Sequence, residues 1–146
     1  MGDAMFLLRA IAVWLIIVGV ESVHGTLRAI YLAPYVGDFQ SRQISVFTGS
    51  LLILLVAYLF IRWIRAETIR PLIFVGLLWL ALTILFDVSL GRFALGLSWE
   101  RLASDYDISH GGLLPFGLII LMLAPLIAAR LRGFKTNNNE ARRWQT

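Results

Sequence analysis

The sequence has no cysteine, and it has only two histidines among its 146 residues. Disulfide bonds, thiolate nucleophiles and cysteine-ligated metal clusters are therefore excluded. The chain also carries no serine-nucleophile motif, no phosphate-binding loop and no zinc-binding spacing of histidines. Together these absences predict a protein that is not an enzyme.

Charged residues are also scarce. Charged residues make up 15% of the chain and hydrophobic residues 59%, whereas soluble domains average about 25% charged and roughly 45–50% apolar residues. The excess falls into four uncharged apolar stretches, and a membrane-spanning helix needs roughly 20 such residues. We therefore predict an all-α integral membrane bundle of four transmembrane helices, at about 5–32, 43–64, 72–90 and 111–130. The polar residues 133–146 are predicted to form a disordered cytoplasmic tail.

The first of these helices is unusual because its apolar stretch is short. Only eleven residues separate Arg9 from Glu21, which is about 16 Å of helix at 1.5 Å per residue. Glu21 and His24 are therefore expected at or just inside the hydrocarbon boundary. Pro34 is expected to end the helix, because proline has no N–H to donate. Residues 33–45 are then expected to connect the first and second helices.

The long connection 91–110 carries a helix signal of its own. Ser98 is a good N-cap residue, so a short helix lying in the membrane interface is predicted over 99–104. The small residues 48–50 of the second helix would let a neighbouring helix approach closely. Pro125 is expected to kink the fourth helix.

The distribution of basic residues predicts the orientation. With four spans both termini lie on one side, which holds nine of the thirteen basic residues and three of the nine acids. Basic residues are enriched in cytoplasmic loops, so both termini are predicted to be cytoplasmic, in a bacterial-type inner membrane. The same bias explains the net charge of +4 without nucleic acid as a partner. The expected partners are the lipid bilayer and either further copies of the chain or other membrane proteins.

Ionisable residues gather at the predicted outward-facing ends of the helices. Glu21, His24 and Arg28 are three and four residues apart, which puts them on one face of a helix. Asp87 and Arg92, near the end of the third helix, lie at the same predicted level. Charged groups at membrane depth cost about 2.5–3.5 kcal/mol each on insertion scales, so they normally pair or face water. The outward loops could contribute further ionisable residues: Asp38, Arg42, Glu100, Arg101, Asp105, Asp107 and His110.

Two interpretations of this cluster follow. In the first, Glu21 or Asp87 pairs with Arg28 or Arg92 in a structural network that fixes helix register and binds no ligand. In the second, the cluster is an outward-facing polar pocket that supports a small-solute, proton or ion pathway, or an accessory role in a larger complex. Glu21 and Asp87 would then handle the proton or cation, with the arginines as counter-charges. His24 would relay protons near neutral pH.

A third interpretation is a haem- or metal-binding redox subunit of the membrane. Glu21-x-x-His24 has the spacing used by di-iron four-helix bundles, but those need the motif twice with two further glutamates. His24, Glu21 and Asp87 could hold a single metal ion, and His24 with His110 could hold a haem. No cofactor is predicted, because the motif occurs once and His110 precedes two glycines that favour a loop.

Several runs of this sequence resemble an uncharacterised group of small bacterial inner-membrane proteins with four helices. The resemblance covers most of the chain outside the polar tail, and it implies the same four-span architecture. It brings no activity, substrate, cofactor or site assignment with it. The runs that carry it are Glu21-x-x-His24-Gly25-x-x-Arg28, Gly37-Asp38-Phe39, Arg42-Gln43, Val46-Phe47-Thr48-Gly49-Ser50, Phe86-Asp87-x-Ser89-x-Gly91-Arg92-Phe93, Ser98-Trp99-Glu100-Arg101-Leu102 and Asp105-Tyr106-Asp107.

Overall fold

The computed structural model describes residues 2–66 and 68–133, and the predicted polar tail lies almost wholly outside them. Of the described residues 89% are helical and none forms a strand. Four helical segments are long and apolar enough to span a membrane, which confirms the all-α, four-span prediction at that level. Their outer surfaces are rich in exposed apolar side chains such as Leu15, Leu51 and Leu85, as contact with lipid requires.

The first span is longer than the sequence predicted. Helix α1 (Gly2–Leu27) continues through a π-helical turn, η1 (Arg28–Leu32), into α2 (Ala33–Val36). The prediction that Pro34 ends the helix is wrong. In a regular α-helix a proline ring clashes with the carbonyl group four residues earlier. For Pro34 that carbonyl belongs to Ile30, which lies in the wider π turn. The chain breaks instead at Gly37, whose φ of 89° is open to glycine.

The other three spans follow with shifted bounds. Helix α3 (Asp38–Ile64) starts directly after Gly37, so most of the expected connection 33–45 is helical. Helix α4 (Ile69–Ser89) includes Pro71 in its first turn, where no N–H is needed, and runs on through a second π turn, η2 (Leu90–Ala94). Helix α6 (Leu114–Leu131) is the shortest span and contains Pro125.

The short helix predicted in the long connection is present. Helix α5 (Trp99–Tyr106) begins after Ser98, whose side chain accepts a hydrogen bond from the Arg101 N–H. A 3₁₀ turn, η3 (Ile108–His110), then leads to α6. His110 therefore lies in a turn before α6.

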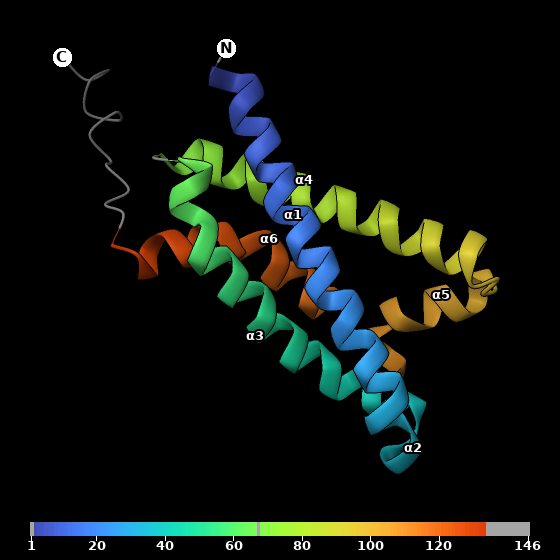
Figure 1. Cartoon of the computed structure of the whole chain (residues 1–146). Helices are drawn as coiled ribbons and strands as arrows, with labels where there is room; N and C mark the ends of the chain where they lie inside the picture. Colours follow the sequence, from blue (N-terminus) through green and yellow to red (C-terminus); the bar gives the residue numbers. More distant parts are fainter. Residues whose placement is uncertain (1, 67, 134–146) are drawn as a thin grey trace.

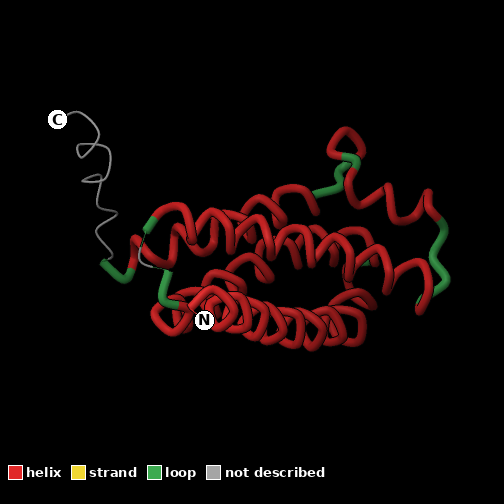
Figure 2. Tube along the Cα trace, turned by 90° about the horizontal axis from the view of Figure 1, so that it is seen from above, coloured by secondary structure: helices red, strands yellow, loops and turns green. Residues whose placement is uncertain are grey.

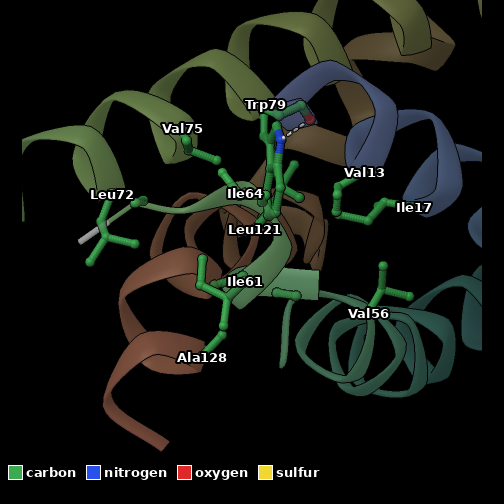
Figure 3. Close-up of a cluster of buried hydrophobic side chains, with 14 of the residues drawn as sticks. Val13, Ile17, Val56, Ile61, Ile64, Leu72, Val75, Trp79, Leu121 and Ala128 are labelled. Carbon is green, nitrogen blue, oxygen red and sulfur yellow. Dashed lines mark hydrogen bonds between the residues drawn. The ribbon is translucent and has the colours of Figure 1, made fainter. Parts of the chain in front are cut away.

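The four spans pack as a bundle in which chain neighbours are not always spatial neighbours (Figures 1 and 2). Helix α3 packs mainly against α6 and α1, and α4 packs mainly against α6 and, over a smaller area, α1. Apolar side chains of all four spans, among them Val13, Ile61, Trp79 and Leu121, fill the centre (Figure 3). The buried Trp79 indole donates to the Ala10 carbonyl oxygen at 2.9 Å, which ties α4 to α1.

One end of the bundle, which we call the inner end, gathers the start of α1 and the ends of α3 and α6 (Figure 1). The Arg9 guanidinium donates to the Trp63 carbonyl oxygen at 3.3 Å, and Arg132 donates to the Tyr58 carbonyl oxygen at 2.8 Å. The opposite end, which carries α2 and α5, is the outer end. That the inner end is cytoplasmic stays a prediction from the distribution of charge.

Candidate ionisable site at the outer end

Glu21 places a carboxylate inside the bundle at membrane depth. A Cβ atom at position 49 would lie 2.8 Å from Glu21 Oε2, so the acid of α1 fills the space that Gly49 of α3 leaves open. Gly49 is about 22 Å along α3 from Ile64 at the inner end, well within the roughly 30 Å of a hydrocarbon core. The second oxygen, Oε1, is buried and has no hydrogen-bond partner among the described residues.

His24 connects this carboxylate to α3. Its Nδ1 lies 3.5 Å from Glu21 Oε2, and its Nε2 lies 2.7 Å from the Thr48 hydroxyl. The side chains of His24 and Glu21 are 19% and 31% exposed, so neither is fully enclosed by the bundle. The sequence identified residues 48–50 as a close-packing patch. The structure gives two of them contacts with the ionisable face of α1 as well.

Asp87 brings a second carboxylate to this site from α4. It lies within electrostatic range of Glu21, as the sequence predicted from their common depth. Tyr106 of α5 lies nearby and was not predicted. Burial, followed by the negative charges of Asp87 and Asp105, raises the pKa of the Tyr106 phenol above its ordinary value.

Two buried hydroxyl groups complete the site. The Tyr106 hydroxyl and the Ser45 Oγ are buried, and neither has a hydrogen-bond partner within the described part of the chain. Ser45 precedes Gly49 by one helical turn and so lies on the same face of α3. The sequence indicated the depth of Glu21, His24 and Asp87 but not these two hydroxyls, because an isolated serine or tyrosine carries no pattern. We call Glu21, His24, Ser45, Asp87 and Tyr106 the outer site.

A separate network of arginines and aspartates joins α1, α3 and α5. Asp38 lies 3.4 Å from Arg28, 3.1 Å from Arg42 and 3.4 Å from Arg101. Asp105 pairs with Arg42, and with Arg101 at 3.2 Å. These five residues, which we call the clamp, are partly exposed. The predicted pairing of Arg28 with Glu21 or Asp87 is wrong, because Asp38 lies closer once α3 begins directly after Gly37.

Arg92 has a different environment. Its Nη1 donates to the Leu97 carbonyl oxygen at 3.2 Å, and its guanidinium stacks over the Trp99 ring at 5.4 Å. No carboxylate pairs with it in residues 2–66 and 68–133. The predicted pairing of Arg92 with Glu21 or Asp87 is therefore also wrong, because η2 turns the end of α4 toward α5.

The remaining predicted loop residues lie outside the outer site. Asp107 Oδ2 is 2.6 Å from His110 Nδ1, and Asp107 Oδ1 accepts from the Ser109 hydroxyl. These hydrogen bonds, that from Ser109 first, hold the pKa of Asp107 below its ordinary value. Glu100 lies in the first turn of α5 and is exposed. Of the seven loop residues predicted from the sequence, four therefore belong to the clamp and two to this turn, and Glu100 belongs to neither.

Neither cofactor alternative gains support. Within the described residues, no group of three or more histidine and acidic side chains is placed to hold a metal ion, so His24, Glu21 and Asp87 form no such site. The two proposed haem ligands have other neighbours: His24 bonds Thr48, and His110 bonds Asp107 with its side chain 81% exposed. Such an exposed ring on a turn cannot be held rigidly as a haem ligand.

Comparisons with known proteins add no family. No protein-family model matches the sequence, and neither a curated protein nor a solved structure shows significant similarity to it.

Proposed function

We propose that this is a non-enzymatic membrane protein whose outer site binds a small monovalent cation or exchanges a proton with the outward-facing solution. One observation carries the proposal: Glu21 Oε1 is buried at membrane depth without a hydrogen-bond partner in the described chain. An ionisable group at that depth is costly and normally has a partner. A bound cation or proton would supply it.

The donor atoms of the outer site favour this class of ligand. Besides the carboxylates of Glu21 and Asp87, the outer site contains the hydroxyls of Ser45 and Tyr106, which are buried without a hydrogen-bond partner in the described chain. Oxygen atoms are the ligands that hard cations prefer. Two carboxylates supported by neutral oxygens suit a small monovalent cation or a shared proton. A transition metal is less well suited, because in the described residues His24, Glu21 and Asp87 are not placed together as a group of three ligands.

Binding at the outer end is better supported than passage through the bundle. On the inner side of Glu21 the centre is filled by apolar side chains such as Val13, Ile17 and Val56. The Trp14 indole there donates to the Thr83 hydroxyl at 3.0 Å, so that pair is already satisfied. A water-filled route would have to displace this packing.

The clamp supports a structural role for the loop residues. Its five side chains pair with one another, and the predicted ion-pair network that binds no ligand thus describes Arg28, Asp38, Arg42, Arg101 and Asp105 better than it describes Glu21. We propose that the clamp holds α5, with Tyr106, against the outer site.

The proposal is tested by ion binding to the protein in lipid nanodiscs. Radiolabelled sodium and rubidium ions should bind saturably, and acidification should compete with them. Glu21→Gln should lower the affinity by at least about tenfold, the typical value of one charge-assisted contact, and Asp87→Asn should also lower it. Glu100→Gln is the matched control, because this exposed acid lies outside the site, and it should bind like wild type.

Proteoliposomes separate binding from transport. We expect no sodium or proton flux above that of protein-free liposomes. A flux that Glu21→Gln abolishes would replace the binding function with a pathway. If wild type neither binds ions nor takes up protons at this site, or if Glu21→Gln behaves like Glu100→Gln, the outer site is a structural feature and the proposal fails.

We further propose that the bundle resides in a bacterial-type inner membrane with both termini in the cytoplasm, where it associates with copies of itself or with other membrane proteins. The excess of basic residues on the side of the termini supports the orientation. The small volume that four short helices enclose supports the association.

A further inference from the structure

Arg92 is set apart from the other arginines of the outer end by its lack of a carboxylate partner. Arg28, Arg42 and Arg101 each pair with Asp38, and the last two also with Asp105. Within the described residues Arg92 has only the Leu97 carbonyl and the Trp99 ring. A guanidinium has five N–H donors in a planar fork, so most of its donors remain available to an anionic group.

The position of Arg92 along α4 places it at the level of lipid phosphates. Arg70 and Arg92 are separated by about 33 Å of helix at 1.5 Å per residue, slightly more than the roughly 30 Å of a bilayer's hydrocarbon core, and Asp87 is the one charged residue between them. The two arginines therefore flank the hydrocarbon on opposite sides. Arg92 then lies where the phosphodiester groups of the outer leaflet begin.

Exposed apolar side chains surround Arg92 on the same segment. Phe93, Leu95 and Trp99 are 83%, 64% and 58% exposed. They come from η2, from the turn after it and from the start of α5, which lie together at the outer end (Figure 1). Arginine beside exposed aromatic rings is the side-chain combination that suits the boundary between headgroups and acyl chains.

We propose that the segment 92–99 binds the phosphodiester of an outer-leaflet phospholipid. Arg92 donates to the phosphate through the N–H groups that the Leu97 carbonyl leaves open. The Trp99 ring holds the guanidinium from one face, and Phe93 and Leu95 enter the acyl-chain region. The bidentate geometry of arginine matches a phosphate. The proposal does not depend on the function of the outer site.

The test is photocrosslinking in nanodiscs with a phosphatidylglycerol that carries a diazirine next to its phosphate. Adducts should map to the segment 92–99 in wild type. Arg92→Gln should reduce that yield by about tenfold, as expected for loss of a charge-assisted bidentate contact, and Arg92→Lys should retain part of it. Arg28→Gln is the matched control: it removes the same charge from an outer-end arginine whose partners, Asp38 and Ser41, belong to α3, and should leave the yield unchanged.

Each further outcome decides the proposal. Adducts near Arg130 and Arg132 at the inner end serve as an internal measure of folding, and should be equal in all variants. Equal yields on 92–99 from wild type and Arg92→Gln, or from a diacylglycerol probe without phosphate, would overturn the proposal in favour of simple apolar insertion. Competition by excess inorganic phosphate would also overturn it, because the site would then recognise the free anion.

Discussion

At the scale of single residues, the outer site depends on the absence of a side chain at position 49. Glu21 projects from α1 toward α3, and only hydrogen atoms on Gly49 leave room for its carboxylate. A carboxylate in this position cannot be shielded by water on the side that faces α3. The same contact that admits the acid therefore also desolvates it, and links helix packing to the chemistry of the site.

We expect Gly49→Ala to disrupt both the packing of α1 against α3 and the chemistry of the outer site. The new Cβ would lie 2.8 Å from Glu21 Oε2, so the carboxylate must move away from its place beside His24. Because the displaced atoms are the end of a flexible side chain, the cost should be at the low end of overpacking, about 1 kcal/mol. Thermal unfolding in detergent should show the loss of stability, and sodium binding in nanodiscs should weaken.

Two variants make this prediction specific. Gly19→Ala adds the same methyl group to α1 where nothing lies within 4 Å, so it should be neutral or stabilise by roughly 0.5–1 kcal/mol through helix propensity. Adding Glu21→Asp to Gly49→Ala shortens the acid by one methylene and should recover part of the stability. Equal stability of Gly49→Ala and Gly19→Ala would contradict the proposed packing.

At the scale of helices, the clamp holds α5 in place. This helix has eight residues and buries none of them fully, so its apolar contacts, mainly through Leu102 and Tyr106, are limited. Its ionic contacts run to α3 through Asp38 and Arg42. Partly exposed pairs are each worth about 0.2–1 kcal/mol and are screened by salt. Helix α5 should therefore be among the first elements to open locally.

Asp105→Asn should release α5, because it removes the charge that pairs with both Arg42 and Arg101. Amide hydrogen exchange should accelerate several-fold across 99–106, while exchange in α3 and α6 stays near that of wild type. High salt should produce the same change in the unmodified protein. Asp107→Asn is the control, since Asp107 bonds only within its own turn; equal acceleration in both variants would count against the clamp.

The helices could be predicted from the sequence where a local pattern determines their position. Apolar length identified four spans, and Ser98 identified α5. The end of the first span was not predictable, because Pro34 stops a regular helix but not one that has widened into a π turn. Whether a chain adopts that turn depends on packing around it, which no local rule reports.

The ionisable site was only partly predictable for a similar reason. Depth along each helix was enough to group Glu21, His24 and Asp87. Pairing depends on which helices are neighbours and on how each is rotated, and sequence spacing gives neither. Asp38 therefore proved to be the partner of Arg28, and Tyr106 was missed although it is within electrostatic range of Asp87.

At the scale of the whole molecule, orientation is the prediction to test first. A cytoplasm-active reporter fused after Thr146 should be active, and the same reporter inserted after Gly96 should be inactive. Gly96 is suitable because its φ is 65° and it lies in an open turn with nothing close to it. A periplasm-active reporter should give the opposite pattern at both sites. Activity of the cytoplasmic reporter at Gly96 alone would reverse the orientation.

The packing order of the four spans also has a consequence for biosynthesis. Helices α3 and α4 leave the ribosome one after the other, yet both pack mainly on α6, and α3 alone also packs extensively on α1. Since α6 is the last span to be made, α4 enters the bilayer before its main partner exists. Placement of α4 in the bundle must therefore wait for the final helix, and nascent chains that stop before Leu114 would present unpaired faces of α3 and α4 to the quality-control proteases of the membrane.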